Sequence, residues 1–484
     1  MKFLLTAAGL IAAGVLSAAV QLPSLFSNHA VLARKANVPV FGKADPGEKV
    51  VVTFNGQQAE TTAGADGRWR VALDLSKSPE GPFELKVNEI TVKDVVVGEV
   101  WLCSGQSNMA FMMAGAIGLK DELKALPGPR MRCFMVGGGA SVEPLDTCKG
   151  KWVYADAANL KFFSAVSYFF AKELLKNGVG PVGLIKSAQG GAKIESWMSE
   201  ESLKELVPDA KEQAAKRNPK VKTFRIPLMM FNARLNPLVP YRLSGVIWYQ
   251  GESNASAAAR YAPLFRAMIQ DWRKRFEDPD LPFYWCNLPA YRPRSNDPAE
   301  EGTWPGLRAA QTAVLDLPHT GQAVLIDTGE TGDIHPRDKR PAGARLGALA
   351  LNRVYGQKRP DCGPSVDKVV RDGSRLRITF RDATGGLKAA PVPEKYDIAT
   401  KKGTTAQTVR NSPKTQLEGF ALCGADGKWH WADEAVIDGD TVAVSSAAVP
   451  VPTGVKYAWQ NSPVCNLYNG EGFPAVPFKC DAVK

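Results

Sequence analysis

The chain has 484 residues, of which 45% are apolar, so it can build more than one hydrophobic core. Its formal net charge is +11, but the Lys and Arg residues are dispersed and no nucleic-acid-binding motif is present. We therefore expect no nucleic-acid partner, and solubility or attraction to acidic glycans accounts better for the positive charge.

Residues 1–19 have the features of a signal peptide. Lys2 supplies the positive start, residues 3–16 are apolar, and Ser17 and Ala19 are the small residues that a signal peptidase requires. The apolar stretch is shorter than the ~20 residues of a membrane-spanning helix, and no later stretch is apolar enough for one. The sequence thus predicts an exported protein, periplasmic or secreted, without a membrane span.

Residues 20–95 predict a small antiparallel β domain. The runs 50–54 and 69–73 are rich in β-branched and aromatic residues. Asn55-Gly56 and Asp66-Gly67 are hairpin dipeptides, because both central residues of a type I′ turn need a positive φ.

Residues 96–360 alternate short apolar runs with segments of helical periodicity, which is typical of an α/β layer fold. The runs lack polar alternation, as in strands buried on both faces. The predicted strands are residues 99–103, 182–186, 245–249, 283–287 and 323–327. The predicted helices are residues 259–276, whose apolar residues form one face, and residues 342–355.

The β pattern returns from residue 361 onward. Residues 375–380 and 441–444 predict strands, and the dipeptides Asp426-Gly427 and Asp438-Gly439 predict turns. We expect a second β domain over 361–455. Residues 456–484 show little periodicity and are expected to pack back on the body as an ordered tail.

The eight cysteines could form disulfides in an exported protein. Cys103 and Cys286 lie inside apolar runs and are better interpreted as buried thiols. Two pairs would close short loops if they were oxidised: Cys133 with Cys148, and Cys465 with Cys480. None of these spacings resembles a zinc site.

Ser107 is the first candidate for chemistry. It follows the predicted strand 99–103 and a tight turn, at the start of a possible helix. There, exposed backbone N–H groups favour the negative charge that develops when a hydroxyl attacks an ester carbonyl. Taken alone, a serine in this position is more often just a helix N-cap.

His335 supplies the base that such a serine needs. The chain has four histidines, and only His335 follows a predicted strand of the α/β region, so that it shares a sheet edge with Ser107. Asp333 is close enough in sequence to orient the imidazole, which completes a Ser, Asp, His order. Asp327 and Glu252 are the alternative acids.

Two further loops offer donors for an oxyanion hole. Gly190 and Gly191 follow the strand 182–186, and Gln250 and Asn254 follow the strand 245–249. Adjacent glycines let backbone N–H groups approach a substrate, and a side-chain amide adds another donor. Each loop alone is weak evidence, because glycine after a strand usually marks only a turn.

Three segments together carry a resemblance to a known family. They are Gly-Gln-Ser-Asn-Met at 105–109, Ile-Trp-Tyr-Gln-Gly-Glu-Ser-Asn at 247–254 and Asp-Ile-His-Pro at 333–336. They resemble the signature blocks of the sialate O-acetylesterase family, and supporting segments extend the resemblance over nearly the whole mature chain.

The resemblance implies an SGNH-hydrolase catalytic domain, a flavodoxin-like three-layer fold with a parallel sheet, flanked by N-terminal and C-terminal β domains. It implies removal of O-acetyl groups from sugars, first of all from O-acetylated sialic acids, without a cofactor. Carried over, it makes Ser107 the nucleophile, His335 the base, and Gly190 or Gly191 the backbone oxyanion donor.

The chain departs from the wider SGNH pattern at two points. Many members have the acid three residues before the histidine, where this chain has Gly332, and their third block has a Gly-x-Asn core that is altered here at 250–254. We therefore choose Asp333 as the acid and Gln250 as the third oxyanion donor, with Asn254 as the alternative.

Other functions remain as alternatives. An acetylesterase of xylan or another polysaccharide would share the same blocks, since loops select the substrate. A non-catalytic glycan-binding protein would suit the β domains, but the intact Ser107 and His335 argue against it. A metal hydrolase would need a ligand cluster, and His335 has no histidine near it in the sequence.

Overall fold

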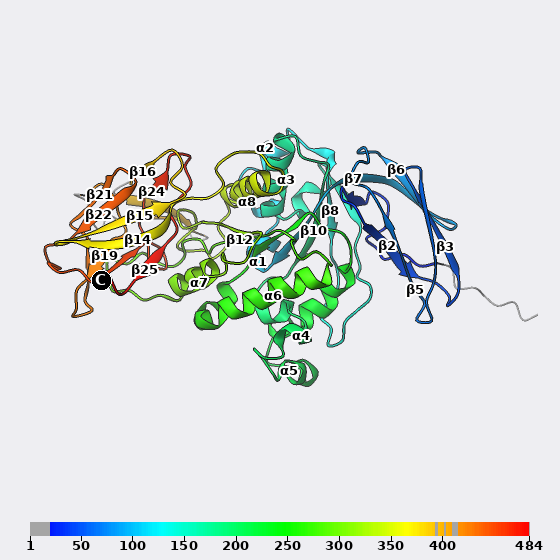
Figure 1. The fold of residues 1–484 in the computed structure, drawn as a ribbon, viewed down its shortest axis with the longest axis horizontal. Coiled ribbons are helices and arrows are strands. Elements are labelled where there is room, and N and C mark those ends of the chain that lie inside the picture. Colours follow the sequence, from blue (N-terminus) through cyan, green and yellow to red (C-terminus); the bar gives the residue numbers. More distant parts are fainter. Residues whose placement is uncertain (1–19, 393–394, 401–402, 409–414, 484) are drawn as a thin grey trace, which may run out of the picture.

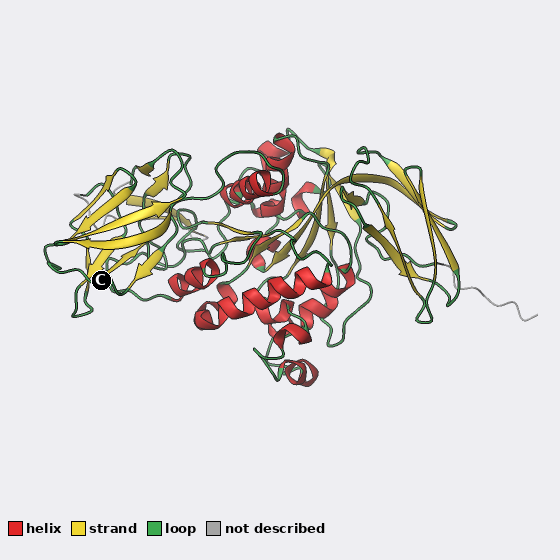
Figure 2. Ribbon diagram, viewed as in Figure 1, coloured by secondary structure: helices red, strands yellow, loops and turns green. Residues whose placement is uncertain are grey.

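The computed structural model describes residues 20–392, 395–400, 403–408 and 415–483, so the predicted signal peptide lies outside the described residues. An N-terminal β region, a central region of strands and helices, and a C-terminal β region follow one another along an elongated molecule (Figures 1 and 2). None of the helices in the described part is long and apolar enough to cross a bilayer.

The N-terminal region is built of short, mainly antiparallel strands. They are β1 (Val31–Ala33), β2 (Val38–Lys43), β3 (Lys49–Phe54), β4 (Gln57–Thr62), β5 (Arg68–Leu73) and β6 (Phe83–Val87). Asn55 and Gly56 both have positive φ and join the paired strands β3 and β4, as predicted. The Asp66-Gly67 prediction is wrong as a hairpin, because β5 pairs with β2 and not with β4.

Strand β7 (Ile90–Gly105) belongs to two regions. Its first residues pair with β6 of the N-terminal region, and residues from Glu99 onward pair with strands of the central sheet. The predicted boundary between residues 95 and 96 therefore falls inside one continuous strand. This strand fixes the N-terminal β region to the central sheet.

The central sheet confirms the predicted α/β layer fold. Its strands are ordered β13-β12-β11-β7-β10-β8-β9, and all neighbours are parallel except β8 and β9. They are β8 (Gly128–Met135), β9 (Trp152–Ala155), β10 (Val182–Ala188), β11 (Gly245–Tyr249), β12 (Phe283–Cys286) and β13 (Thr320–Ala323). Without the edge pair β8 and β9, the order is the flavodoxin-like 2-1-3-4-5, whose switch point lies between β7 and β11.

Helices cover both faces of this sheet, with α3 and α8 on one face and α6 and α7 on the other (Figure 1). The helices are α1 (Ser107–Ala110), α2 (Leu119–Glu122), α3 (Ala165–Lys176), α4 (Glu200–Leu203), α5 (Ala210–Lys216), α6 (Tyr261–Arg275), α7 (Thr303–Thr312) and α8 (Arg340–Arg353). The predicted apolar face of α6 is buried, from Tyr261 to Trp272. The sheet thus lies in the middle of three layers.

The last predicted strand, 323–327, is displaced in the structure. Strand β13 ends at Ala323, and Val324 and Ile326 are buried in the core of the C-terminal β region instead. Their apolar character reflects contact between two regions, which local periodicity cannot distinguish from a central strand.

The C-terminal region contains two four-stranded sheets, ordered β14-β15-β22-β21 and β20-β19-β23-β25, and the two-stranded pairs β16-β24 and β17-β18. Its strands are β14 (Ser365–Asp372), β15 (Arg375–Arg381), β16 (Leu387–Ala389), β17 (Lys395–Thr400), β18 (Gly403–Thr408), β19 (Phe420–Cys423), β20 (Trp429–Trp431), β21 (Glu434–Asp438), β22 (Thr441–Ser445), β23 (Gly454–Tyr457), β24 (Leu467–Asn469) and β25 (Phe478–Cys480). The two Asp-Gly dipeptides join paired strands, as predicted.

The chain after residue 456 is more regular than predicted, because β24 and β25 are strands of these sheets. The same stretch also contacts the central region. Arg308 of α7 donates to the carbonyl of Gln460 at 2.7 Å, and Asn461 accepts the backbone N–H of Trp304 at 3.2 Å. The C-terminal stretch therefore joins the last β region to the layer of α6 and α7.

All eight cysteines lie in the described part of the chain, and all are free thiols there. Cys103 and Cys286 are buried, as predicted. The pairings Cys133 with Cys148 and Cys465 with Cys480 are not formed. Cys133 is buried in β8 of the central sheet, and Cys480 pairs with Val455 in β25, so these cysteines belong to sheets rather than to free surface loops.

Candidate active site

The turn after β7 brings Ser107 to the carboxyl edge of the sheet. Gly105 has a φ of +134°, and a Cβ there would lie 2.2 Å from the carbonyl oxygen of Tyr249, so only glycine fits. The next residue, Gln106, donates its backbone N–H to the same carbonyl at 2.9 Å. The chain then turns into α1, whose first residue is Ser107. This turn lies at the switch point of the sheet.

His335 lies against Ser107, although the two residues are far apart in sequence. The distance between Ser107 Oγ and His335 Nε2 is 2.8 Å, which is a hydrogen bond. The histidine comes from the loop between β13 and α8. The structure therefore brings together the predicted nucleophile and the predicted base.

Asp333 is the carboxylate beside this histidine. Its Oδ1 lies 3.4 Å from His335 Nδ1 and accepts the backbone N–H of the same residue at 3.0 Å. The alternative acids have other partners, since Asp327 pairs with Arg345 at 2.7 Å and Glu252 accepts from Asn108 at 2.5 Å. The geometry thus favours Asp333 as the residue that orients the imidazole.

The two glycines of the loop after β10 differ in their surroundings. A Cβ at Gly190 would lie 3.6 Å from Ser107 Cβ, whereas a Cβ at Gly191 would lie 2.9 Å from the ring of Phe224. Gly191 also has a φ of +74°. The backbone of Gly190 is therefore the part of this loop beside the nucleophile.

Gln250 does not fit the role that the sequence predicted for it. Its Nε2 donates to the carbonyl of Ala192 at 3.1 Å and to Asn254 Oδ1 at 2.8 Å, and its Oε1 accepts from Tyr261. Both amide hydrogens are used inside the protein, because a buried amide must find such partners. Gln250 is therefore corrected to a structural residue under the site.

Asn254 remains the candidate for the side-chain donor. Its Oδ1 accepts from Gln250 and from the backbone N–H of Ile194 at 3.0 Å, and its Nδ2 donates to Glu195 at 2.9 Å. These bonds fix the orientation of the amide group. Its part in an oxyanion hole stays a prediction.

Sequence reasoning missed a buried polar group next to Ser107. Asn108 accepts from the ammonium of Lys339, and its Nδ2 donates to Glu252 Oε1 at 2.5 Å and to the carbonyl of Ile334 at 3.0 Å. Burial raises the pKa of Glu252 and lowers the pKa of Lys339 to about 8. The signature segments contain Asn108 and Glu252, but no sequence signal marks Lys339 as buried.

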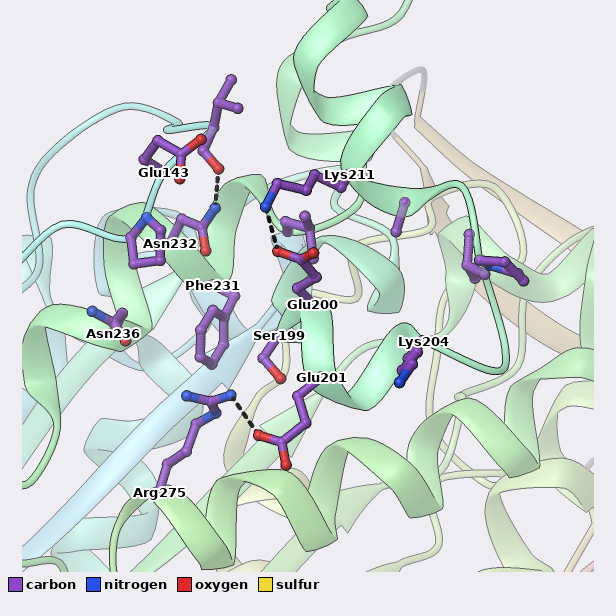
Figure 3. A pocket seen from close by; sticks show the side chains of 16 residues that line it. Glu143, Ser199, Glu200, Glu201, Lys204, Lys211, Phe231, Asn232, Asn236 and Arg275 are labelled. Carbon is purple, nitrogen blue, oxygen red and sulfur yellow. Dashed lines mark hydrogen bonds and ion pairs between the residues drawn. The ribbon is translucent and has the colours of Figure 1, made fainter.

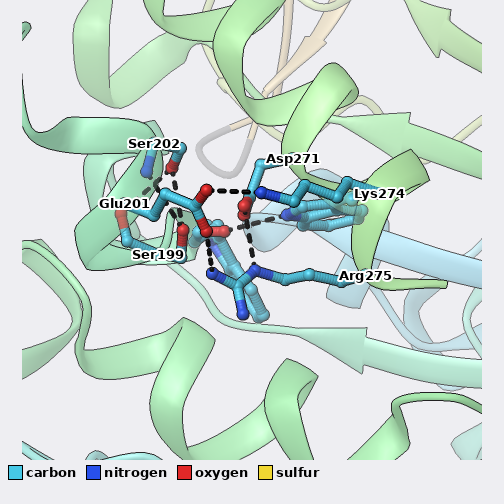
Figure 4. A network of polar contacts seen from close by, with 8 residues as sticks. Ser199, Glu201, Ser202, Asp271, Lys274 and Arg275 are labelled. Carbon is cyan, nitrogen blue, oxygen red and sulfur yellow. Dashed lines mark hydrogen bonds and ion pairs between the residues drawn. The ribbon is translucent and has the colours of Figure 1, made fainter. Parts of the chain in front are cut away.

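A separate cavity of about 550 Å³ lies between the α4 and α5 segment, residues 142–144 and the segment 228–236, with Arg275 of α6 at its side (Figure 3). None of the predicted site residues lines it. Ion pairs cross it, with Lys211 on Glu200 at 3.2 Å and Arg275 on Glu201 at 3.4 Å. Figure 4 shows that Glu201 also pairs with Lys274, while Arg275 pairs with Asp271. The Ser107 and His335 pair lies elsewhere, so this cavity is not the site built around the predicted nucleophile.

The described residues contain no group of three or more His, Cys, Asp or Glu side chains arranged to hold a metal ion. The residues gathered at Ser107 instead comprise a hydroxyl, an imidazole, a carboxylate and backbone N–H groups. These are the parts needed for acyl transfer through a covalent intermediate.

Comparisons with known proteins agree with this chemistry. A family model described as a carbohydrate esterase, sialic acid-specific acetylesterase, matches residues 97–335. The sialate O-acetylesterases of Mus musculus and Homo sapiens are 28% and 29% identical over 94% of this chain, covering 93% and 91% of their own lengths. A solved carbohydrate acetylesterase from Xanthomonas citri is 36% identical, with a TM-score of 0.82, over 96% of this chain and 99% of its own.

Proposed function

Because the chain belongs to the carbohydrate esterase family of sialic acid-specific acetylesterases, we propose that it removes O-acetyl groups from sialic acids. Membership makes the protein a carboxylic ester hydrolase that deacetylates sugars. The observation that carries the proposed chemistry is the 2.8 Å hydrogen bond between Ser107 and His335 at the switch point of the sheet.

In the proposed first step, Ser107 Oγ attacks the acetyl carbonyl carbon while His335 Nε2 takes the hydroxyl proton. The carbonyl electron pair moves to oxygen and forms a tetrahedral oxyanion. The backbone N–H groups of Ser107 and Gly190, with the amide of Asn254, are the proposed donors to this oxyanion. Collapse of the intermediate expels the sugar oxygen, which takes the proton from His335 and leaves acetyl-Ser107.

The second step hydrolyses acetyl-Ser107. Water gives one proton to His335 Nε2 and its oxygen attacks the acetyl carbon. Collapse of the second tetrahedral intermediate breaks the bond to Ser107 Oγ, which takes the proton from His335, and releases acetic acid, which ionises to acetate in solution. Asp333, beside Nδ1, holds the imidazole in the required tautomer and stabilises the imidazolium in both steps. No cofactor takes part in the proposed reaction.

Two observations support sialic acid as the sugar. The curated relatives that match 94% of the chain are named sialate O-acetylesterases. In addition, the net charge of +11 attracts an anionic sugar more strongly than a neutral one.

Acetate release distinguishes this substrate from the main alternative, acetylated xylan. We expect the purified protein to release acetate from O-acetylated sialic acids with a higher kcat/KM than from acetylated xylo-oligosaccharides, and Ser107→Ala to release none from either. A higher kcat/KM on the xylo-oligosaccharides would contradict sialic acid as the substrate while leaving the esterase chemistry in place.

We also propose that the protein works after export. The support is the pattern of Lys2, the apolar residues 3–16 and the small residues Ser17 and Ala19. Mass spectrometry of the protein from its native cells should find the mature N-terminus near residue 20, and an intact Met1 in the mature protein would contradict export by this route.

A further inference from the structure

Lys339 is a buried cation directly behind the nucleophile. The side chain belongs to a residue that is only 1% exposed, at the start of α8. Its ammonium donates to Asn108 Oδ1 and lies 5.0 Å from the ring centroid of Phe111 and 5.5 Å from that of Tyr249. Asn108 and Phe111 belong to the segment that follows β7, and Tyr249 is the last residue of β11.

The side chain of Asn108 connects Lys339 to the loop that carries His335. Because its Oδ1 faces the ammonium, its Nδ2 must face the other way, where it donates to Glu252 and to the carbonyl of Ile334. Ile334 precedes His335 in the chain. One amide group therefore connects the residue after the nucleophile to the residue before the base.

Phe111 gives a second connection. Its ring lies 6.5 Å from the imidazole of His335 with an angle of 24° between the planes, while Lys339 lies over the same phenyl ring. An ammonium near an aromatic face is attracted to it, so Lys339 restrains the ring that supports the histidine.

We propose that Lys339 is a positioning residue, whose buried ammonium fixes Asn108 and Phe111 and through them holds His335 against Ser107. This inference rests on the proposed esterase function. A buried charge is costly unless it is hydrogen-bonded and compensated. The contacts of Lys339 with Asn108 and with the Phe111 ring both lie beside His335, so we infer that this charge serves to position the histidine.

The charges around Lys339 make its protonation observable. Burial lowers the pKa of Lys339 to about 8, while Glu252, Cys286, Glu330 and Asp333 favour the ammonium. Two further titratable groups lie beside it: Tyr249, whose pKa burial raises well above its ordinary value, and Asp338, whose pKa the hydrogen bonds from Arg340 lower. Burial also raises the pKa of Cys286 well above its ordinary value, so this thiol stays protonated. An alkaline decline of kcat near pH 8 therefore reports on Lys339.

The test compares two buried lysines. Lys339→Met keeps the aliphatic volume and removes the ammonium, and Lys456→Met makes the same change in the C-terminal β region, where Lys456 is 2% exposed. On p-nitrophenyl acetate we expect Lys339→Met to lower kcat on the order of 10²-fold, with KM within about twofold, because small displacements of a catalytic base have effects of this size. Its alkaline decline should also disappear, while Lys456→Met should behave as wild type.

The proposal is overturned if Lys339→Met keeps more than half of the wild-type kcat, or if both variants lose activity equally. If Lys339→Met does not fold, the variant Phe111→Leu tests the proposal instead. Phe111 is only partly buried, so we expect this substitution to leave the fold intact. We expect Phe111→Leu to melt near the wild-type temperature and to lose about tenfold in kcat at unchanged KM. Full activity of Phe111→Leu would then overturn the proposal.

Ser107→Ala separates this inference from the proposed function. Activity retained by Ser107→Ala would refute the esterase mechanism itself. An inactive Ser107→Ala together with a fully active Lys339→Met would refute the positioning role alone.

Discussion

Asn108 donates a hydrogen bond from its Nδ2 to the backbone carbonyl of Ile334 at 3.0 Å, and so ties the residue after Ser107 to the residue before His335. The amide is completely buried, and its other contacts fix which side carries the donor. The distance between nucleophile and base is therefore set by the protein interior and not only by the bond between their side chains.

The first prediction concerns the nucleophile. Ser107→Ala removes the hydroxyl that His335 contacts, and we expect turnover of simple acetyl esters to fall by about 10³-fold or more. Thermal unfolding of the variant should match the wild type, because Ser107 is only half-buried and the substitution removes a single oxygen atom. A variant with half of the wild-type activity would exclude Ser107 from the chemistry.

The second prediction concerns the acid. Asp333→Asn keeps the shape of the side chain, but we expect turnover to fall by orders of magnitude, since an amide can hold the wrong imidazole tautomer and cannot stabilise the imidazolium. Asp327→Asn is the matched control, because Asp327 pairs with Arg345 and Tyr468 instead. If Asp333→Asn were nearly silent while Glu252→Gln abolished turnover, Glu252 would be the acid.

The third prediction concerns the oxyanion hole. Asn254→Ala removes the proposed side-chain donor, and the loss of one such donor costs on the order of 10²-fold to 10³-fold in kcat. We expect KM for p-nitrophenyl acetate to change little, because the donor acts on charge that develops only in the transition state. A loss of kcat that comes with a large drop in the melting temperature would instead indicate that Asn254 acts only structurally, through its hydrogen bonds to Gln250 and Glu195.

The fourth prediction concerns the turn before the nucleophile. Gly105→Ala introduces a Cβ 2.2 Å from the carbonyl oxygen of Tyr249 at a φ of +134°. We expect the free energy of unfolding to fall by more than about 2 kcal/mol, since both the backbone conformation and the close approach become unfavourable. Gly139→Ala is the control, because nothing lies within 4 Å of a Cβ there. Wild-type stability of Gly105→Ala in denaturant would contradict the geometry.

The fifth prediction concerns the stability of the protein at different pH values. Burial lowers the pKa of Lys456 to about 8, whereas a lysine in the unfolded chain keeps a pKa of about 10.4. Between these values the unfolded state binds a proton that the native state does not, so this lysine makes stability rise with pH.

Lys456→Met should therefore be more stable than the wild type at pH 7, and its advantage should shrink as the pH approaches about 10. Denaturant titrations of both proteins at pH 7 and pH 10 measure this difference. A difference in unfolding free energy that does not change with pH would contradict the lowered pKa.

The predictions from sequence succeeded where the signal is local. The turn at Asn55 and Gly56 follows from the φ values that these residues tolerate, and the buried face of α6 follows from the spacing of its apolar residues. The predicted strand 323–327 was wrong because its signal is not local. Val324 and Ile326 pack in the core of the C-terminal β region, and their apolar character alone does not tell this contact from a central strand.

The sequence by itself determined the order of most elements and the turn before Ser107, because these depend mainly on neighbours within a few residues. It also singled out His335, but through the expected place of its loop at the sheet edge. Only the tertiary structure decided which polar groups remain available for chemistry. Gln250 does not have its predicted role, because both of its amide hydrogens are bonded inside the protein. Lys339, which the sequence did not mark, is buried and donates to Asn108, the residue after the nucleophile. The bond from Gln250 to Ala192 spans 58 positions and the bond from Lys339 to Asn108 spans 231, so no local pattern encodes these contacts.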